Sequence, residues 1–257
     1  MRLSTTIEGE GEPFAILHGL FGSGRNWATA AKRLAARWFT LALDLRNHGA
    51  SPWADGMGYP EMAADVWETL EGEDAGSAPV ILGHSMGGKT AMAAALMRPG
   101  DVRALIVVDI APVAYGHSNA EYIDAMRAVD LGAVSRRADA DAALSAAVPE
   151  AGLRGFLLQN LAFEDGAARW RLNLDAIEAG MESLMAFPYE QGTARFDGPA
   201  LFIGGSRSDY LRPEHQGAIK AFFPAARIET IEGAGHWVHA EAPAAFMAAV
   251  EGFLAEI

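Results

Sequence analysis

Short apolar segments alternate along the chain with longer segments whose apolar residues recur at helical spacing. Several short segments are hydrophobic throughout instead of alternating with polar residues, which is typical of parallel strands covered on both faces. Strands are predicted at 14–17, 39–45, 80–83, 104–110, 200–205 and 226–231, and helices at 27–36, 59–70, 88–97, 213–222 and 243–254. This order predicts a doubly wound α/β fold, with a mostly parallel central sheet flanked by helices. The opening segment 3–11 predicts a weaker antiparallel strand or hairpin at the sheet edge.

One interval breaks this alternation. Between 111 and 196 the pattern predicts no strand, and helical spacing of apolar residues appears at 119–129, 139–148, 153–163 and 174–187. We expect residues 1–110 and 197–257 to form the core and residues 111–196 to form a helical cap inserted between two strands. Such a cap would cover the carboxyl ends of the strands, where open α/β sheets bind ligands. The alternative is that these helices are an addition to the fold that covers no ligand site.

Composition narrows the setting. The chain has 257 residues, 51% of them hydrophobic, no cysteine and a formal charge of −13. The lack of cysteine excludes disulfides, thiolate metal sites and a cysteine nucleophile, and no metal or organic cofactor is expected. The acidic charge disfavours nucleic acid and anionic membranes as partners. No signal peptide or membrane span is predicted, so the expected location is the cytoplasm and the expected state a monomer or small homo-oligomer.

A strand-to-helix turn carries the clearest chemical signal. The stretch Gly83–Gly87, "GHSMG", fits the G-x-S-x-G pattern and lies between a predicted strand and a predicted helix. In such a nucleophile elbow a strained turn raises the serine hydroxyl above the sheet, and the start of the helix faces any oxyanion formed beside it. The pattern predicts Ser85 as a nucleophile, against the alternative of an ordinary structural turn.

A serine nucleophile needs a base that takes its proton. His236, in "EGAGHWVHAEAP", follows the last predicted strand and comes late in the chain, as the triad order of this elbow type requires. We therefore predict His236 as the base. The other histidines are assigned structural roles: His239 at the head of the last helix, His84 pointing away from the serine, and His18, His48, His117 and His215 in loops or without a motif.

The carboxylate that orients the base has two candidates. Asp209 lies in the loop after the strand 200–205, the usual place for the acid in this architecture. Asp109 ends the strand that follows the elbow helix and could reach the histidine from there. Spacing along the sequence does not choose between them.

Five motifs, "HGLFGS", "RNHG", "GHSMGGK", "VDIAPV" and "GAGHWVHAE", together resemble the α/β-hydrolase superfamily from about residue 14 to the C-terminus. Within it the chain is similar to the YbfF-type bacterial esterases, whose eukaryotic relatives are mitochondrial α/β-hydrolase-domain proteins. The resemblance implies Ser85 as nucleophile, His236 as base and Asp109 as acid. Asp209 departs from the pattern of that group, which keeps the usual superfamily position open.

The same geometry predicts an oxyanion hole made of backbone N–H groups. Met86, directly after the serine, and Leu20, in the loop after the first parallel strand, are the expected donors, with Phe21 as the alternative to Leu20. We expect an acyl-enzyme mechanism on a small-molecule ester. The resemblance implies short-chain carboxylic esters, with acyl-CoA thioesters as a second substrate class.

Candidate substrate contacts are less specific. The apolar residues expected to line the acyl site are Phe21, Tyr122, Met126, Phe156, Leu157, Met181, Met185 and Trp237, and the residues that could meet a CoA phosphate are Arg127, Arg136 and Arg137. Packing of cap helices and solvated charges are the respective alternatives. Ser85 excludes a haloalkane dehalogenase, which needs an aspartate at the elbow. A carbon–carbon bond hydrolase with the same triad and a catalytically silent ligand-binding protein remain alternative functions.

Overall fold

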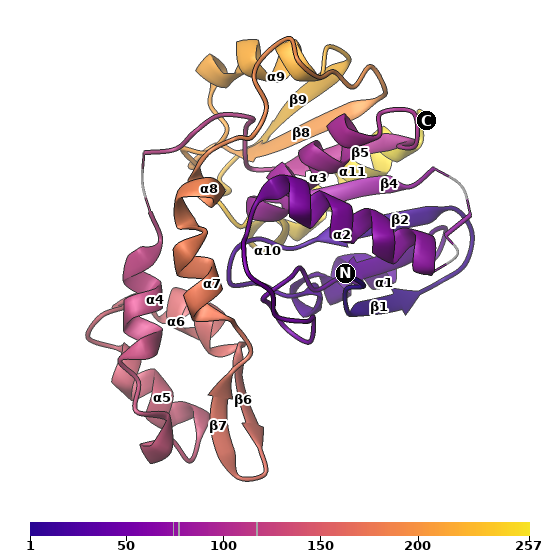
Figure 1. The fold of residues 1–257 in the computed structure, drawn as a ribbon. Helices are drawn as coiled ribbons and strands as arrows, with labels where there is room; N and C mark the ends of the chain where they lie inside the picture. The colour runs from indigo at the N-terminus through magenta and orange to yellow at the C-terminus, as the bar shows by residue number, and fades with distance from the viewer. Residues whose placement is uncertain (74, 77, 117) are drawn as a thin grey trace.

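A seven-stranded sheet forms the centre of the computed structural model, which describes residues 1–73, 75–76, 78–116 and 118–257 (Figure 1). His117 therefore lies outside the described residues. The strand order is β1-β3-β2-β4-β5-β8-β9, and all neighbours are parallel except β1, which runs antiparallel to β3 at one edge. The strands are β1 (Thr5–Glu8), β2 (Pro13–Leu17), β3 (Phe39–Leu43), β4 (Val80–His84), β5 (Ala104–Val108), β8 (Ala200–Gly205) and β9 (Ala226–Ile231).

Helices cover both faces of this sheet because its central strands are apolar on both sides. Ile81 of β4 packs into the same cluster as the helices α2 and α3, whereas Leu82 packs into the cluster that contains α1 and α11. The helices of this part of the chain are α1 (Ala28–Leu34), α2 (Tyr59–Gly72), α3 (Met86–Met97), α9 (Gln216–Phe222), α10 (Val238–Glu241) and α11 (Pro243–Leu254), with short 3₁₀ turns η1 (Gly24–Trp27) and η3 (Pro213–His215). The predicted α/β fold with a mostly parallel, helix-flanked sheet is confirmed. None of the described helices is long and apolar enough to span a membrane.

The interval 111–196 forms a group of elements beside the sheet, coloured magenta to orange in Figure 1. The prediction that it contains no strand is wrong, because a two-stranded antiparallel hairpin follows α6. Asp165 and Gly166, at the tip, both have positive φ, as the two central residues of a tight hairpin turn require. The elements are α4 (Ala120–Arg127), η2 (Leu131–Ala133), α5 (Arg137–Leu144), α6 (Ala151–Leu158), β6 (Leu161–Glu164), β7 (Ala167–Trp170), α7 (Leu174–Ala179) and α8 (Met181–Met185).

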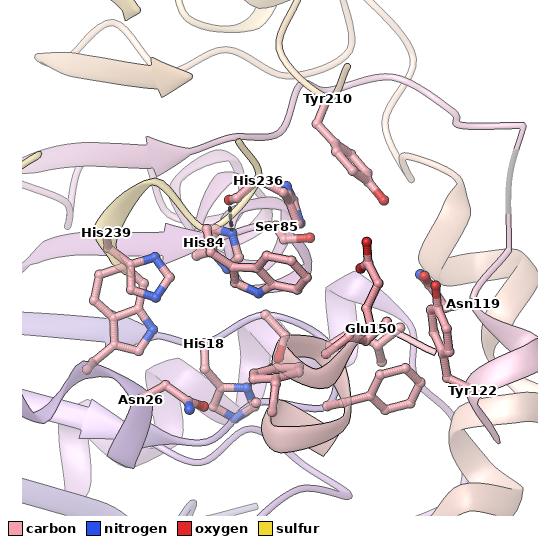
Figure 2. A pocket seen from close by; sticks show the side chains of 18 residues that line it. His18, Asn26, His84, Ser85, Asn119, Tyr122, Glu150, Tyr210, His236 and His239 are labelled. Carbon is pink, nitrogen blue, oxygen red and sulfur yellow. Dashed lines mark hydrogen bonds between the residues drawn. The ribbon is translucent and has the colours of Figure 1, made fainter. Parts of the chain in front are cut away.

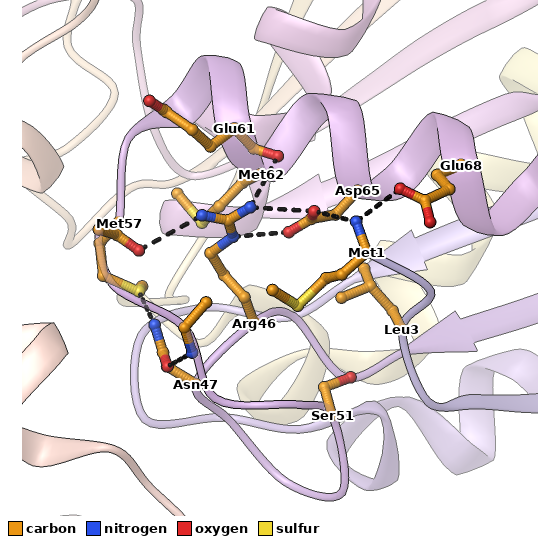
Figure 3. A network of polar contacts seen from close by, with 12 residues as sticks. Met1, Leu3, Arg46, Asn47, Ser51, Met57, Glu61, Met62, Asp65 and Glu68 are labelled. Atoms are coloured by element: carbon orange, nitrogen blue, oxygen red, sulfur yellow. Dashed lines mark hydrogen bonds and ion pairs between the residues drawn. The ribbon is translucent and has the colours of Figure 1, made fainter.

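The "RNHG" motif fixes the loop after β3 to its surroundings (Figure 3). The guanidinium of Arg46 is 9% exposed and forms two hydrogen bonds, of 2.6 and 2.9 Å, with the buried carboxylate of Asp65 on α2. Asn47, with a φ of 65°, accepts a hydrogen bond from the side chain of Asn173 at 3.1 Å. The motif therefore joins the core both to α2 and to the start of α7.

Candidate active site

Ser85 lies on the predicted turn between β4 and α3, in a strained backbone conformation with φ 53° and ψ −118°. A non-glycine residue takes such a conformation only where the surrounding structure imposes it. Close packing around the turn does so: a Cβ on Gly83 would lie 2.0 Å from the carbonyl oxygen of Gly87, and one on Gly87 would lie 2.4 Å from that of His18. Both flanking positions are thus restricted to glycine.

His236 and Asp109 meet beside this turn although 127 residues separate them. Asp109 follows the end of β5, and His236 lies in the loop after β9. Asp109 Oδ2 is 2.7 Å from His236 Nδ1, and the Asp109 side chain has no solvent exposure. Because a carboxylate oxygen accepts hydrogen bonds, this contact favours the His236 tautomer that carries its proton on Nδ1. Figure 2 shows the His236 ring beside the Ser85 side chain.

Asp209 does not take part in this arrangement. Its side chain is 85% exposed, and it pairs with Arg212 at 2.6 Å. The loop that carries Asp209 instead supplies hydrogen-bond donors to Asp109: Gly205 N–H donates to Oδ1 at 3.1 Å, and the Ser208 hydroxyl donates to Oδ2. The geometry therefore brings Asp109, and not Asp209, to His236.

A cavity of about 240 Å³ opens above Ser85 and His236. Four of the predicted substrate contacts, Phe21, Tyr122, Phe156 and Trp237, line it. A second, smaller pocket of about 30 Å³ also reaches Ser85, and Met185 lines that one.

The expected contacts of Met126, Met181 and Leu157 are wrong. Met126 and Leu157 have no solvent exposure and Met181 is 7% exposed, and all three belong to the hydrophobic core. The apolar faces of the short helices in 111–196 pack against one another and against the main core, because each helix has to bury its stripe somewhere. Helical periodicity identifies such residues as buried without saying which of them face a cavity.

The two alternatives for the loop donor of the oxyanion hole differ in their contacts. Phe21, with a φ of 59°, already donates its N–H to His48 Nε2 at 3.2 Å. Leu20 lines both the cavity and the smaller pocket at Ser85. Met86 is the first residue of α3, so its N–H has no acceptor within the helix. Leu20 and Met86 both line the smaller pocket at Ser85.

Two histidines brace the loops around the site, as predicted. His18 Nε2 accepts from Leu45 N–H at 2.9 Å, and His48 Nε2 accepts from Phe21 N–H, so both rings are neutral acceptors on that nitrogen. Burial lowers the pKa of His18 to about 4 and, together with the neighbouring His18, that of His48 to about 3. His215, without a motif, lies in η3 and accepts a hydrogen bond from Arg212 N–H.

His84 differs from its prediction, because it does not point away from the site. It lines the cavity together with Ser85, and its Nε2–H donates to the backbone carbonyl of His236 at 2.9 Å (Figure 2). Burial holds the pKa of His84 well below its ordinary value. His239 lies in α10, before the last helix, and stacks on Trp27 with ring centres 4.1 Å apart.

Three further residues at the cavity have no motif and were not predicted. Tyr210 stacks on the His236 ring, with centres 4.1 Å apart and an angle of 26° between the planes. Asn119 and Glu150, from the interval 111–196, line the cavity opposite Ser85. Only Tyr210 had a signal in the sequence, its place next to the candidate Asp209.

The arginines considered for a CoA phosphate have other partners. Arg127 pairs with Asp175 at 2.5 Å and with Glu178 at 2.6 Å. Arg136 pairs with Asp139 at 2.9 Å, and Arg137 donates to the carbonyl oxygens of Leu158 and Leu161. None of the three lines the cavity at Ser85.

Comparison with known proteins relates this site to a family. Residues 12–243 match the family model described as alpha/beta hydrolase fold. The chain is 44% identical to the sn-1-specific diacylglycerol lipase ABHD11 of Mus musculus, over 93% of this chain and 80% of that protein. It is 37% identical to Esterase YbfF of Escherichia coli, over 94% of this chain and 92% of that protein. A solved structure titled "Marine microorganism esterase" superposes with a TM-score of 0.94 at 39% identity, covering 98% of this chain and 99% of the other.

Proposed function

The chain belongs to the α/β-hydrolase fold family and is a carboxylic ester hydrolase, and from this premise we propose that it acts through a Ser85–His236–Asp109 triad and an acyl-enzyme. The observation that carries the proposal is the 2.7 Å hydrogen bond between Asp109 and His236 at the strained turn that presents Ser85. Asp109 fixes the tautomer in which His236 Nε2 is the acceptor, the form that can take a proton from a serine hydroxyl.

The reaction has two halves. Ser85 Oγ attacks the ester carbonyl while His236 Nε2 takes its proton, and the resulting imidazolium gives that proton to the departing alcohol. Water, deprotonated by the same nitrogen, then attacks the acyl-enzyme carbonyl; the bond to Ser85 Oγ breaks, His236 returns the proton to Oγ, and the acid is released. The buried Asp109 carboxylate stabilises the imidazolium in both halves, supported by its donors Gly205 and Ser208.

Leu20 and Met86 supply the oxyanion hole in this proposal. Both residues line the smaller pocket at Ser85, whereas the Phe21 N–H is held by His48. A single donor of this kind is typically worth about 3 kcal/mol of transition-state stabilisation. The orientation of the loop after β2, which His18 and His48 brace, therefore matters directly for the rate.

We assign residues 111–196 the role of a cap over the cavity. Polar contacts fix this segment to the core beside the site: Lys89 Nζ, on the elbow helix, donates to the carbonyl oxygens of Met185 at 3.0 Å and Ala186 at 2.6 Å. Asn160 Nδ2 donates to the Phe21 carbonyl oxygen at 2.8 Å. Tyr122 and Phe156 of the cap, with Phe21 and Trp237 of the core, would contact the apolar part of the substrate.

The proposed substrates are small esters with short acyl chains, and thioesters are cleaved by the same steps. A cavity of about 240 Å³ suits a small molecule. The names of the relatives, a diacylglycerol lipase and esterases, are consistent with uncharged ester substrates.

A substrate panel tests the proposal. p-Nitrophenyl esters with two to eight acyl carbons and acetyl-CoA would be assayed with the wild type, Ser85→Ala and His236→Gln. We expect ester turnover that is highest for short chains and falls at least about 10³-fold in both variants. Undiminished turnover by Ser85→Ala would contradict the triad. If the wild type binds these ligands without turning them over, the alternative of a catalytically silent ligand-binding protein is favoured. If it turns over only substrates with a scissile carbon–carbon bond, the alternative of a carbon–carbon bond hydrolase is favoured.

A further inference from the structure

Two spaces of unequal size meet at Ser85. The smaller pocket, of about 30 Å³, has room for about two water-sized groups, while the cavity of about 240 Å³ also borders an open groove between α6 and α10. His236 lines the cavity but not the smaller pocket. Because His236 must hand its proton to the leaving oxygen, the alcohol part of the ester belongs in the cavity and a short acyl group in the smaller pocket.

Among the described residues that line the cavity, one carries a carboxylate and none is a lysine or an arginine. Its other lining residues are neutral, and Glu150 is the single acidic residue among them. Glu150 precedes α6 as its N-cap residue, yet its side chain forms no capping hydrogen bond. Figure 2 shows the carboxylate directed into the cavity, towards the space between Ser85, Asn119 and Tyr122.

The charge of Glu150 is not balanced by a neighbour. No hydrogen bond or ion pair joins its carboxylate to another residue of the described part of the chain. Glu150 also contributes, after burial and Glu121, to the raised pKa of Tyr122, which lines the same cavity. Arg25 lines the outer groove only, where Glu241 and Glu150 are also present. A substrate group in the cavity therefore meets one negative charge.

We infer that Glu150 is a specificity-determining residue, which makes the enzyme favour esters of neutral or cationic alcohols and disfavour anionic leaving groups such as CoA. The inference rests on the proposed function of Ser85 and His236. Its physical basis is the Coulomb interaction between the leaving group and the carboxylate of Glu150, an exposed residue that lines the cavity, and salt screens this interaction. Arg127, Arg136 and Arg137 pair with other groups and do not line the cavity, so none of these three arginines meets a leaving group there.

A matched set of three acetate esters tests this inference: phenyl acetate, 3-acetoxybenzoate and 3-acetoxy-N,N,N-trimethylanilinium, which differ in the charge of the leaving phenol. The kcat/KM of each would be measured at low ionic strength for the wild type, Glu150→Gln and Glu182→Gln. Glu182 is an exposed residue of α8 that lines neither space at Ser85, so it controls for the change in net charge. Comparing variants on one substrate cancels the differing reactivity of the three phenols.

We expect Glu150→Gln to leave the kcat/KM for phenyl acetate within about twofold of the wild-type value. The kcat/KM for the anionic ester should rise at least about threefold, and that for the cationic ester should fall by a similar factor. Molar salt should weaken both shifts, and Glu182→Gln should produce neither. Unchanged relative rates in Glu150→Gln, with normal phenyl acetate turnover, would overturn the inference while leaving the proposed function intact. Phenyl acetate turnover that survives Ser85→Ala would overturn the proposed function itself.

Discussion

Asp109 Oδ2 lies 2.7 Å from His236 Nδ1, so the carboxylate that orients the histidine comes from the end of β5. The loop after β8 contributes the partners of that carboxylate, Gly205 and Ser208, while its own Asp209 faces solvent. The end of β5 thus carries the carboxylate, and the end of the neighbouring strand β8 supplies its hydrogen-bond donors.

Exchanging the two aspartates separately distinguishes their roles. Asp109→Asn should lower kcat for p-nitrophenyl acetate by about 10³–10⁴-fold, because an amide favours the wrong tautomer of His236 and does not stabilise its imidazolium. Asp209→Asn loses only an exposed ion pair with Arg212, so its kcat for p-nitrophenyl acetate should stay within about twofold of the wild-type value. The reverse outcome, a collapse with Asp209→Asn alone, would assign the acid to the loop after β8.

Removing the hydroxyl of Ser208 should weaken the support of Asp109. A hydrogen bond to a charged group contributes about 1.5–3 kcal/mol, so Ser208→Ala should reduce kcat/KM by about 10-fold or more. Ser206, in the same loop, contacts Gly233 N–H instead, and Ser206→Ala serves as the matched control. Equal effects of both substitutions would point to general loosening of the loop and against a specific role of Ser208.

The elbow glycine Gly83 should tolerate no side chain. Its Cβ would lie 2.0 Å from the Gly87 carbonyl oxygen, a backbone atom that moves only with the whole turn, so Gly83→Ala should lower the free energy of unfolding by more than about 2 kcal/mol. Gly217, within α9, has open space around its Cβ position, and Gly217→Ala should be neutral or stabilising. Urea unfolding of both variants measures the contrast. Similar unfolding midpoints would contradict the packing described for the turn.

Acid should destabilise the fold through its buried neutral histidines. The pKa of His18 is lowered from 6.5 to about 4 and that of His48 to about 3, so between pH 6.5 and 4 the unfolded chain binds more protons than the folded chain. Stability is therefore retained above pH 6.5 and lost as the pH falls through this window, by up to about 2 kcal/mol for each histidine between pH 7 and 5.

Urea unfolding at pH 7 and pH 5 measures this loss, and His48→Gln provides the control. The glutamine amide oxygen can accept the hydrogen bond of Phe21 N–H without titrating. The unfolding of the variant should therefore take up about one proton fewer, and its free energy of unfolding should depend less on pH. If the free energy of unfolding of His48→Gln falls between pH 7 and pH 5 as much as that of the wild type, His48 does not contribute to the acid sensitivity.

The sequence predicted the sheet well because the periodicity of its strands is local information. The bounds of β8 and β9 agree with the prediction, and the others differ by a few residues at their ends. Ser85 and His236 each stand in a motif whose place relative to a strand and a helix is local, and the structure brings both to one cavity. The choice between Asp109 and Asp209 was not local, because it depends on which of two strand-end loops turns its carboxylate inward.

The interval 111–196 was harder to predict for two physical reasons. The predicted helix 153–163 includes Leu161–Phe163, whose apolar residues fit a strand as well as a helix, so periodicity alone does not separate β6 from α6. Glu150 and Asn119 belong to no motif, and only the folding of this interval over the sheet brings them to the cavity.

Covalent labelling of Ser85 tests the central claim most directly. A fluorophosphonate reacts with an activated serine by forming an O–P bond and releasing fluoride, and intact-protein mass spectrometry with peptide mapping locates the label. The account predicts stoichiometric labelling of Ser85 in the native wild type, together with loss of esterase activity, and at least about 10³-fold slower labelling in Asp109→Asn. Labelling of a different residue with loss of activity, or full esterase activity in a protein labelled at Ser85, would contradict it.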